Sequence, residues 1–200
     1  MKFTFNWFGY AYQEGLRVIL QSYLSASEAV TLDVERAKDE AFAYQEGVAQ
    51  GGEWIGERDG EGVVIWDHQD ILDMRVQSAE AAAMALRKAF ALAFYHHWER
   101  SARGWTGSMH AKHEKLIAET QAKGYPVHNR LAAIRALANT LKHDNAVWGQ
   151  RLTVLWPEVL TAAPISTGKT DWYELVHLTN AHLLEIQAAL EASGPTALGH

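Results

Sequence analysis

The sequence predicts an all-α fold, a single antiparallel bundle of five to six main helices in one domain over residues 1–200. Apolar residues recur at alternating steps of three and four along most of the chain, which is the period of an amphipathic helix. Glycines and prolines stand between these periodic segments, where helices end. Because the intervening loops are short, neighbouring helices are expected to run antiparallel.

Helices are predicted over residues 1–50, and Ser25 and Glu28 divide them because these two residues have the spacing of a capping box. A Gly-Gly pair ends the second of them. Residues 53–66 break the helical period and combine a charged, glycine-containing turn with a short β-branched run. A small non-helical arm is therefore expected there.

The remaining helices are predicted over residues 69–192, which would form the core of the bundle. They are expected at 69–103, 108–123, 127–143, 150–155 and 170–192, with a loop over 162–169.

Composition limits the classes of protein to which this chain can belong. Its content of 48% hydrophobic and 21% charged residues is typical of a globular protein. No apolar run is long enough to cross a bilayer, and the N-terminus lacks the pattern of a signal peptide. We therefore expect a cytoplasmic protein with no membrane partner.

Two further features limit the chemistry. The sequence contains no cysteine, which excludes disulfides, thiolate ligands and thiolate nucleophiles. A formal charge of −6 argues against a broad electrostatic grip on nucleic acid, but it leaves room for a small cationic site.

The helix predicted over residues 127–143 carries the most specific pattern. Arg135, Asn139 and His143 follow one another at steps of four, in a row separate from the apolar stripe. A cation, an amide and an imidazole thus line a face that the helix does not need for its own core. That face meets water, meets a partner, or performs chemistry.

Two stretches of the chain resemble the HEPN superfamily, named for higher eukaryotes and prokaryotes nucleotide-binding. Residues 86–99 are similar to the long helix that ends in an aromatic-Glu pair in many such proteins. Residues 137–143, in which three residues separate Asn139 from His143, are similar to the end of a helix in the superfamily that has an Asn, three further residues and a His. The helix order is compatible over residues 70–190, whereas the N-terminal helices are not explained by the resemblance.

The resemblance implies a helical bundle that often forms a dimer. In active members, an Arg, four to six residues and a His from each subunit meet in the dimer cleft and cut RNA without a metal. Here Ala138 occupies the place where active members commonly have that Arg, and the nearest upstream arginine is Arg135. Asn139 and His143 carry over, but the role of the Arg does not carry over securely.

Metal-free RNA cleavage needs a group that takes the 2′-hydroxyl proton, a group that protonates the leaving oxygen, and cationic donors to the phosphorane. The candidate catalytic residues are His143, Asn139 and Arg135, and the candidate binding residues are Lys142 and Glu99. Each also has an ordinary structural interpretation, such as a helix C-terminal cation for His143 or a surface ion pair for Arg135 and Glu99.

The numerous histidines raise a metal-binding alternative, because helical bundles of the DinB type bind metal through three histidines. His110 and His113 can share a helix face. Zinc usually needs three or four ligands in a tight set, and neither cysteine nor a His-Glu-x-x-His sequence is present. We therefore predict no metal-binding residues and no cofactor, and a histidine metal-binding bundle is the third alternative.

The resemblance leads to one preferred hypothesis. The chain would be a HEPN-like protein that has lost strong nuclease activity and acts as a binding or partner component of a defence or toxin–antitoxin type system. The alternative is an active metal-independent endoribonuclease that uses His143. A homodimer with the Asn139–His143 face near its two-fold axis is expected, and the binding partner would be a protein or RNA.

Overall fold

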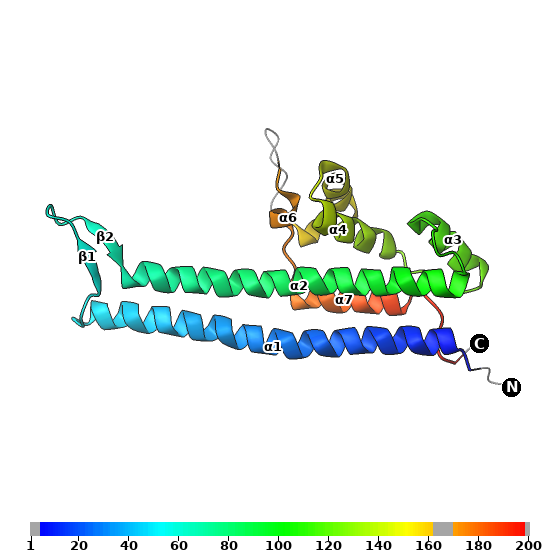
Figure 1. Cartoon of the computed structure of the whole chain (residues 1–200), viewed down its shortest axis with the longest axis horizontal. Coiled ribbons are helices and arrows are strands. Elements are labelled where there is room, and N and C mark those ends of the chain that lie inside the picture. The colour runs from blue at the N-terminus through cyan, green and yellow to red at the C-terminus, as the bar shows by residue number, and fades with distance from the viewer. Residues whose placement is uncertain (1–4, 162–169, 199–200) are drawn as a thin grey trace. The chain divides into compact units, whose positions relative to one another are not determined.

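A computed structural model describes residues 5–161 and 170–198, and this part of the chain is all-α with a small non-helical arm, which confirms the predicted fold class (Figure 1). It contains seven α-helices, one 3-10 turn and one two-stranded sheet. The chain divides into two compact units. The first unit consists of Met1–Tyr23 and Arg87–His200, and the second unit consists of Leu24–Leu86.

Helix α1 (Trp7–Ala49) is continuous, so the predicted start of a new helix at Ser25 is wrong. Its buried positions follow one stripe through this point, and that stripe includes Tyr23, Ser27, Ala37 and Ala41. An uninterrupted apolar face favours one helix, and a serine inside it needs no capping role.

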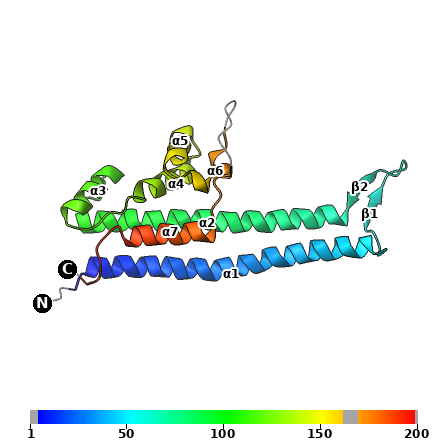
Figure 2. The same ribbon diagram turned by 180° about the vertical axis from the view of Figure 1, so that it is seen from behind.

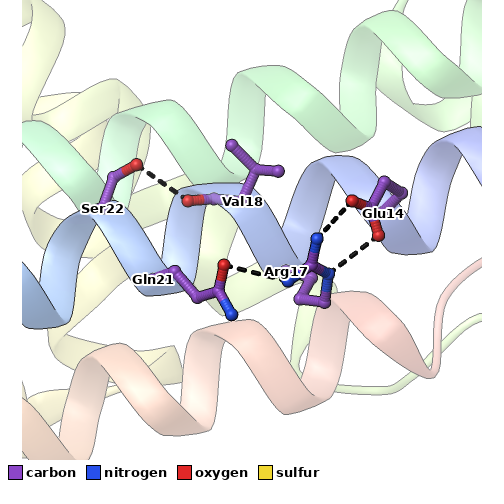
Figure 3. Close-up of polar contacts among 5 residues, drawn as sticks. All are labelled: Glu14, Arg17, Val18, Gln21 and Ser22. Atoms are coloured by element: carbon purple, nitrogen blue, oxygen red, sulfur yellow. Dashed lines mark hydrogen bonds and ion pairs between the residues drawn. The ribbon is translucent and has the colours of Figure 1, made fainter.

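Local side-chain contacts also support helix α1 near its first turns. The Ser22 hydroxyl donates to the carbonyl of Val18 at 2.8 Å (Figure 3). Arg17 donates to both Glu14 and Gln21, one turn before it and one turn after it (Figure 3). These exposed contacts stay within one helix and are ordinary surface interactions.

In the second unit, residues 24–49 of α1 and 68–86 of α2 lie side by side and run antiparallel (Figures 1 and 2). Two ion pairs join the helices, Lys38–Glu80 at 2.6 Å and Arg75–Glu40 at 2.7 Å. Gly51 ends α1 with a φ of 87°, a conformation that glycine adopts without strain.

The predicted non-helical arm is an antiparallel β-hairpin of β1 (Gly56–Arg58) and β2 (Val64–Asp67). The Asp59 carboxylate closes its turn by accepting hydrogen bonds from the backbone of Glu61 at 2.9 Å and of Val63 at 2.8 Å. Asp67 then caps the next helix, because its carboxylate accepts from the backbone N–H of Asp70 at 2.9 Å.

The first unit contains the second half of α2 (His68–Thr106) and the remaining helices. These are α3 (His113–Ala122), α4 (Leu131–His143), α5 (Ala146–Leu155), α6 (Trp172–Leu175) and α7 (Asn180–Glu191), with a 3-10 turn at Pro157–Val159. Trp98 is fully buried, and its indole donates to the carbonyl of Ser193 at 2.7 Å. Trp105 likewise donates to the Thr120 hydroxyl at 3.0 Å. Both tryptophans combine a large apolar contact area with a satisfied polar group.

Four helix boundaries differ from the predictions. Helix α2 continues through Gly104 and ends at Thr106, so residues 107–112 form a turn and α3 begins later than expected. Helix α4 begins at Leu131 and not at residue 127, because a turn follows Pro126. Helix α5 begins earlier than expected, because the Asn145 side chain caps it by accepting from the backbone of Trp148.

The single helix predicted over residues 170–192 is also wrong, because it ends at Leu175 and a second helix begins after Thr179. Asp171 caps α6. Thr179 forms a capping box with His182 at the start of α7. Between the two helices, Val176 forms an isolated bridge with Leu160. The predicted loop at 162–169 lies outside the described residues.

Membrane crossing requires a helix that is both long and strongly apolar. None of the helices in residues 5–161 and 170–198 meets both requirements.

Candidate functional site

A polar pocket of about 300 Å³ lies in the first unit. Three segments provide its lining: the second half of α2, the 107–112 turn with the start of α3, and one face of α4. We call it the cationic pocket, because four cations and one carboxylate line it. The cations are Arg103, Lys112, Arg135 and Lys142, and the carboxylate is Glu99.

Helix α4 contributes Arg135, Ala138, Asn139 and Lys142, whose steps of three and four place them on one face. Arg135 is mostly buried, forms an ion pair with Glu114, and lies 5.0 Å from the ring of Trp148. The Asn139 amide donates to the Arg135 carbonyl at 2.9 Å. A carboxylate and an aromatic ring thus hold the Arg135 guanidinium in place.

Lys142 differs from Arg135 in having no constraint of this kind. Its side chain is exposed at the pocket, and it forms no ion pair with any of the described residues. The Lys142 ammonium is therefore free to meet an anion that enters the pocket.

Helix α2 contributes a chain of charged groups. Glu99 forms an ion pair with Arg103 at 3.1 Å, and its carboxylate lies 3.7 Å from the His96 ring. The Arg103 Nε is buried, and no hydrogen-bond acceptor among the described residues reaches it. A buried donor without a partner is costly, so this arginine retains capacity for a further acceptor.

His113, the first residue of α3, is 5% exposed, and its Nδ1 lies 3.0 Å from the Tyr95 hydroxyl. Burial, together with the positive charge of Arg135, lowers the pKa of His113 to about 4. Burial also raises the pKa of Tyr95. At neutral pH both groups are therefore uncharged, and neither adds to the charge of the pocket.

The distribution of charge along the chain is strongly uneven. The second unit has fourteen acidic and four basic residues, a formal charge of −10. The first unit has ten acidic and fourteen basic residues, a formal charge of +4, and together the units give the −6 of the whole chain. The cationic pocket thus belongs to the part of the protein with a basic balance.

Four of the five candidate residues from the sequence line the cationic pocket, namely Arg135, Asn139, Lys142 and Glu99. His143 is not part of that lining. It is exposed at the end of α4, and its side chain forms no hydrogen bond or ion pair with the described residues. The next residue, Asp144, turns the chain at a φ of 42°, and its carboxylate accepts from the backbone of Trp172 at 2.7 Å.

Tyr95, Arg103 and Lys112 also line the pocket but were not among the candidate residues, and His113 was a candidate only as a metal ligand. Two of these residues could have been found from the sequence. Tyr95 lies four residues before Glu99 and Arg103 lies four residues after it, so all three share one face of the helix. Lys112 and His113 gave no comparable signal, because the turn before α3 had been predicted as helix.

Metal binding needs several donors close together. Among the residues that the structure describes, no group of three or more His, Asp or Glu side chains is placed to hold a metal ion.

Comparison with known proteins found no matching family model, no matching curated protein and no matching solved structure. The relationship to the HEPN superfamily stays a prediction.

Proposed function

We propose that this chain is a binding protein whose cationic pocket takes a phosphate group of single-stranded RNA. The observation that carries this proposal is the convergence of four cations on one small pocket in a chain that is acidic overall. Phosphate is the biological anion that arginine and lysine clusters recognise most directly.

Three further features support a phosphate ligand. Arg103 has a buried donor without an acceptor, and Lys142 has no ion-pair partner among the described residues. The side-chain amide oxygen of Asn139 and the neutral imidazole of His113 offer polar contacts that do not depend on charge. These groups suit a sugar or a base attached to the phosphate.

The resemblance of residues 137–143 to a HEPN helix end supports RNA as the source of the phosphate. It also supports the hypothesis that the protein is a catalytically weakened component of a defence or toxin–antitoxin type system. Because the pocket is small, few phosphates are bound, and recognition of one exposed strand or end fits better than a grip along a duplex.

The first test is the affinity for a fluorescent single-stranded RNA, measured by anisotropy in EDTA. Lys142→Ala and Lys112→Ala should each raise Kd about tenfold, because each removes a charged contact to phosphate. Lys123→Ala is the matched control, because this exposed lysine follows α3 outside the cationic pocket. An equal loss of RNA affinity in all three variants, or no RNA binding by the unmodified chain, would contradict the proposal.

A second candidate function is metal-independent RNA cleavage. The observation that favours it is that His96, His110 and His113 line the same pocket as the cations. An imidazole beside a bound phosphate can act as general acid or base.

We expect little or no cleavage of single-stranded RNA in EDTA by the unmodified chain, because Ala138 stands where active HEPN proteins commonly have an Arg. Incubation of labelled RNA with product analysis on a gel checks this. If cleavage occurs, a positioned acid or base contributes about 10²–10⁴-fold to its rate. Loss in His143→Ala would then support the original candidate, whereas loss in His110→Ala alone would place the chemistry in the pocket.

A further inference from the structure

The β-hairpin of the second unit exposes a group of large apolar side chains. We call residues 53–67 the hairpin tip. Five of its apolar residues have exposed fractions between 38% and 61%, namely Ile55, Val63, Val64, Ile65 and Trp66. Single exposed apolar residues are common on protein surfaces, but several within one short hairpin are typical of an interaction site.

The hairpin tip is ordered by its own contacts. The Asp59 carboxylate closes the turn, and the Arg58 guanidinium lies 4.7 Å from the ring of Trp54. The Trp66 indole donates to Glu57 across the sheet at 3.2 Å. The exposed side chains are thus held in defined positions, which lowers the entropic cost of binding.

The backbone of the tip also has unused hydrogen-bonding capacity. Strands β1 and β2 pair only with each other among the described residues, so each strand has an edge without a strand partner. An unpaired edge can accept an added strand from another chain. An extended segment would bond to the backbone and place alternate side chains against the exposed apolar residues.

The negative charge of the hairpin tip indicates what kind of partner it can bind. Within residues 53–67 there are five carboxylates and one cation, a formal charge of −4. The acidic residues are Glu53, Glu57, Asp59, Glu61 and Asp67, and the cation is Arg58. A second hairpin tip would carry the same negative charge, and RNA is also an anion, so both would be repelled.

We propose that the hairpin tip binds an extended segment of a partner protein in which basic residues alternate with apolar residues. The apolar side chains cover Val63, Ile65 and their neighbours, and the basic side chains meet the surrounding carboxylates. This surface is independent of the cationic pocket and takes a ligand of the opposite charge.

The test uses the full chain and two synthetic peptides of about ten residues, the length of an ordinary strand. One peptide alternates Val with Lys, and the other alternates Val with Glu. Calorimetry measures binding, and amide chemical shifts locate it. We expect the Val-Lys peptide to bind with shifts centred on residues 53–67, and the Val-Glu peptide not to bind.

Ile65→Asp should weaken binding of the Val-Lys peptide by about tenfold, through loss of an apolar contact. Val154→Asp is the control, because this valine is 80% exposed in the first unit and should have no effect. Glu61→Lys changes the charge of the tip from −4 to −2 without touching the apolar group, so it should weaken binding of the Val-Lys peptide even if Ile65→Asp disturbs the hairpin.

Three results would overturn the proposal. Equal binding of both peptides would remove the charge argument. Shifts spread along the acidic surface of α1 would indicate unspecific attraction. Self-association in sedimentation experiments that Ile65→Asp abolishes would show that a second copy occupies the tip.

Discussion

At the scale of single residues, His113 shows how burial and positive charge act together on one side chain. Both disfavour the protonated imidazole, and its pKa is about 4 instead of the ordinary 6.5. Glu114 acts in the opposite direction but is exposed, so water screens its charge. The folded protein therefore keeps His113 neutral at a pH where the unfolded chain protonates it.

This shift makes the stability of the fold depend on pH. Between about pH 6.5 and pH 4 the unfolded state binds the extra proton, so stability should fall as the pH is lowered, by about 3 kcal/mol across this window. Urea unfolding at about pH 7 and about pH 4.5 measures the loss. His113→Gln should reduce that loss while an amide can still contact Tyr95, and part of the loss should remain because burial also lowers the pKa of His97 and of His182. If His113→Gln shows the same loss as the unmodified protein, the assigned environment of His113 is wrong.

At the scale of the elements, the helices were predictable because their apolar spacing is a local property. The residues at which the helices begin and end were harder to predict. Ser25 and Glu28 have the spacing of a cap but lie inside α1, whose buried stripe continues past them. Asp171 and Thr179 do act as caps, although the apolar spacing from Trp172 onward suggested one helix. Spacing alone does not decide whether a polar residue caps a helix or only faces water.

The same distinction applies to the candidate site. Part of the α4 face was predictable, because Arg135 and Asn139 follow helical spacing, but the predicted row ended in His143 and not in Lys142. The contribution of α2 and of the turn before α3 depends on tertiary packing, which leaves no local pattern. His143 satisfied the helical spacing as well as Asn139 did, yet only Asn139 lines the pocket.

The close approach of α5 to α6 gives a direct test of packing. A Cβ at Gly149 would lie 1.9 Å from a ring atom of Trp172, which is itself buried. Gly149→Ala should therefore destabilise the fold by about 1–3 kcal/mol, despite the better helix propensity of alanine. Thermal or urea unfolding measures the change.

Gly104→Ala is the matched control for this substitution. Gly104 also lies inside a helix, but no described atom is within 4 Å of the added Cβ. This variant should gain up to about 1 kcal/mol from helix propensity. A neutral Gly149→Ala beside a stabilising Gly104→Ala would contradict the described packing of α5 on α6.

At the scale of the whole molecule, the modest charge of −6 conceals two units of opposite balance, +4 and −10. Composition alone therefore understated both the cationic and the anionic character of the chain. We propose a basic site for RNA phosphate in the first unit and an acidic, partly apolar docking surface in the second. The homodimer expected from the HEPN resemblance is a separate proposal, and light scattering at micromolar concentration would test it.

The salt dependence of RNA binding tests the central claim most directly. Each phosphate that the protein neutralises on a single strand contributes about −0.7 to the slope of log K against log salt concentration. For a pocket of this size we expect a slope between about −1 and −2. Lys142→Ala should make that slope less negative by about 0.7, whereas Lys123→Ala should leave it unchanged. A slope that is the same in Lys142→Ala and in the unmodified protein would contradict phosphate binding in the cationic pocket.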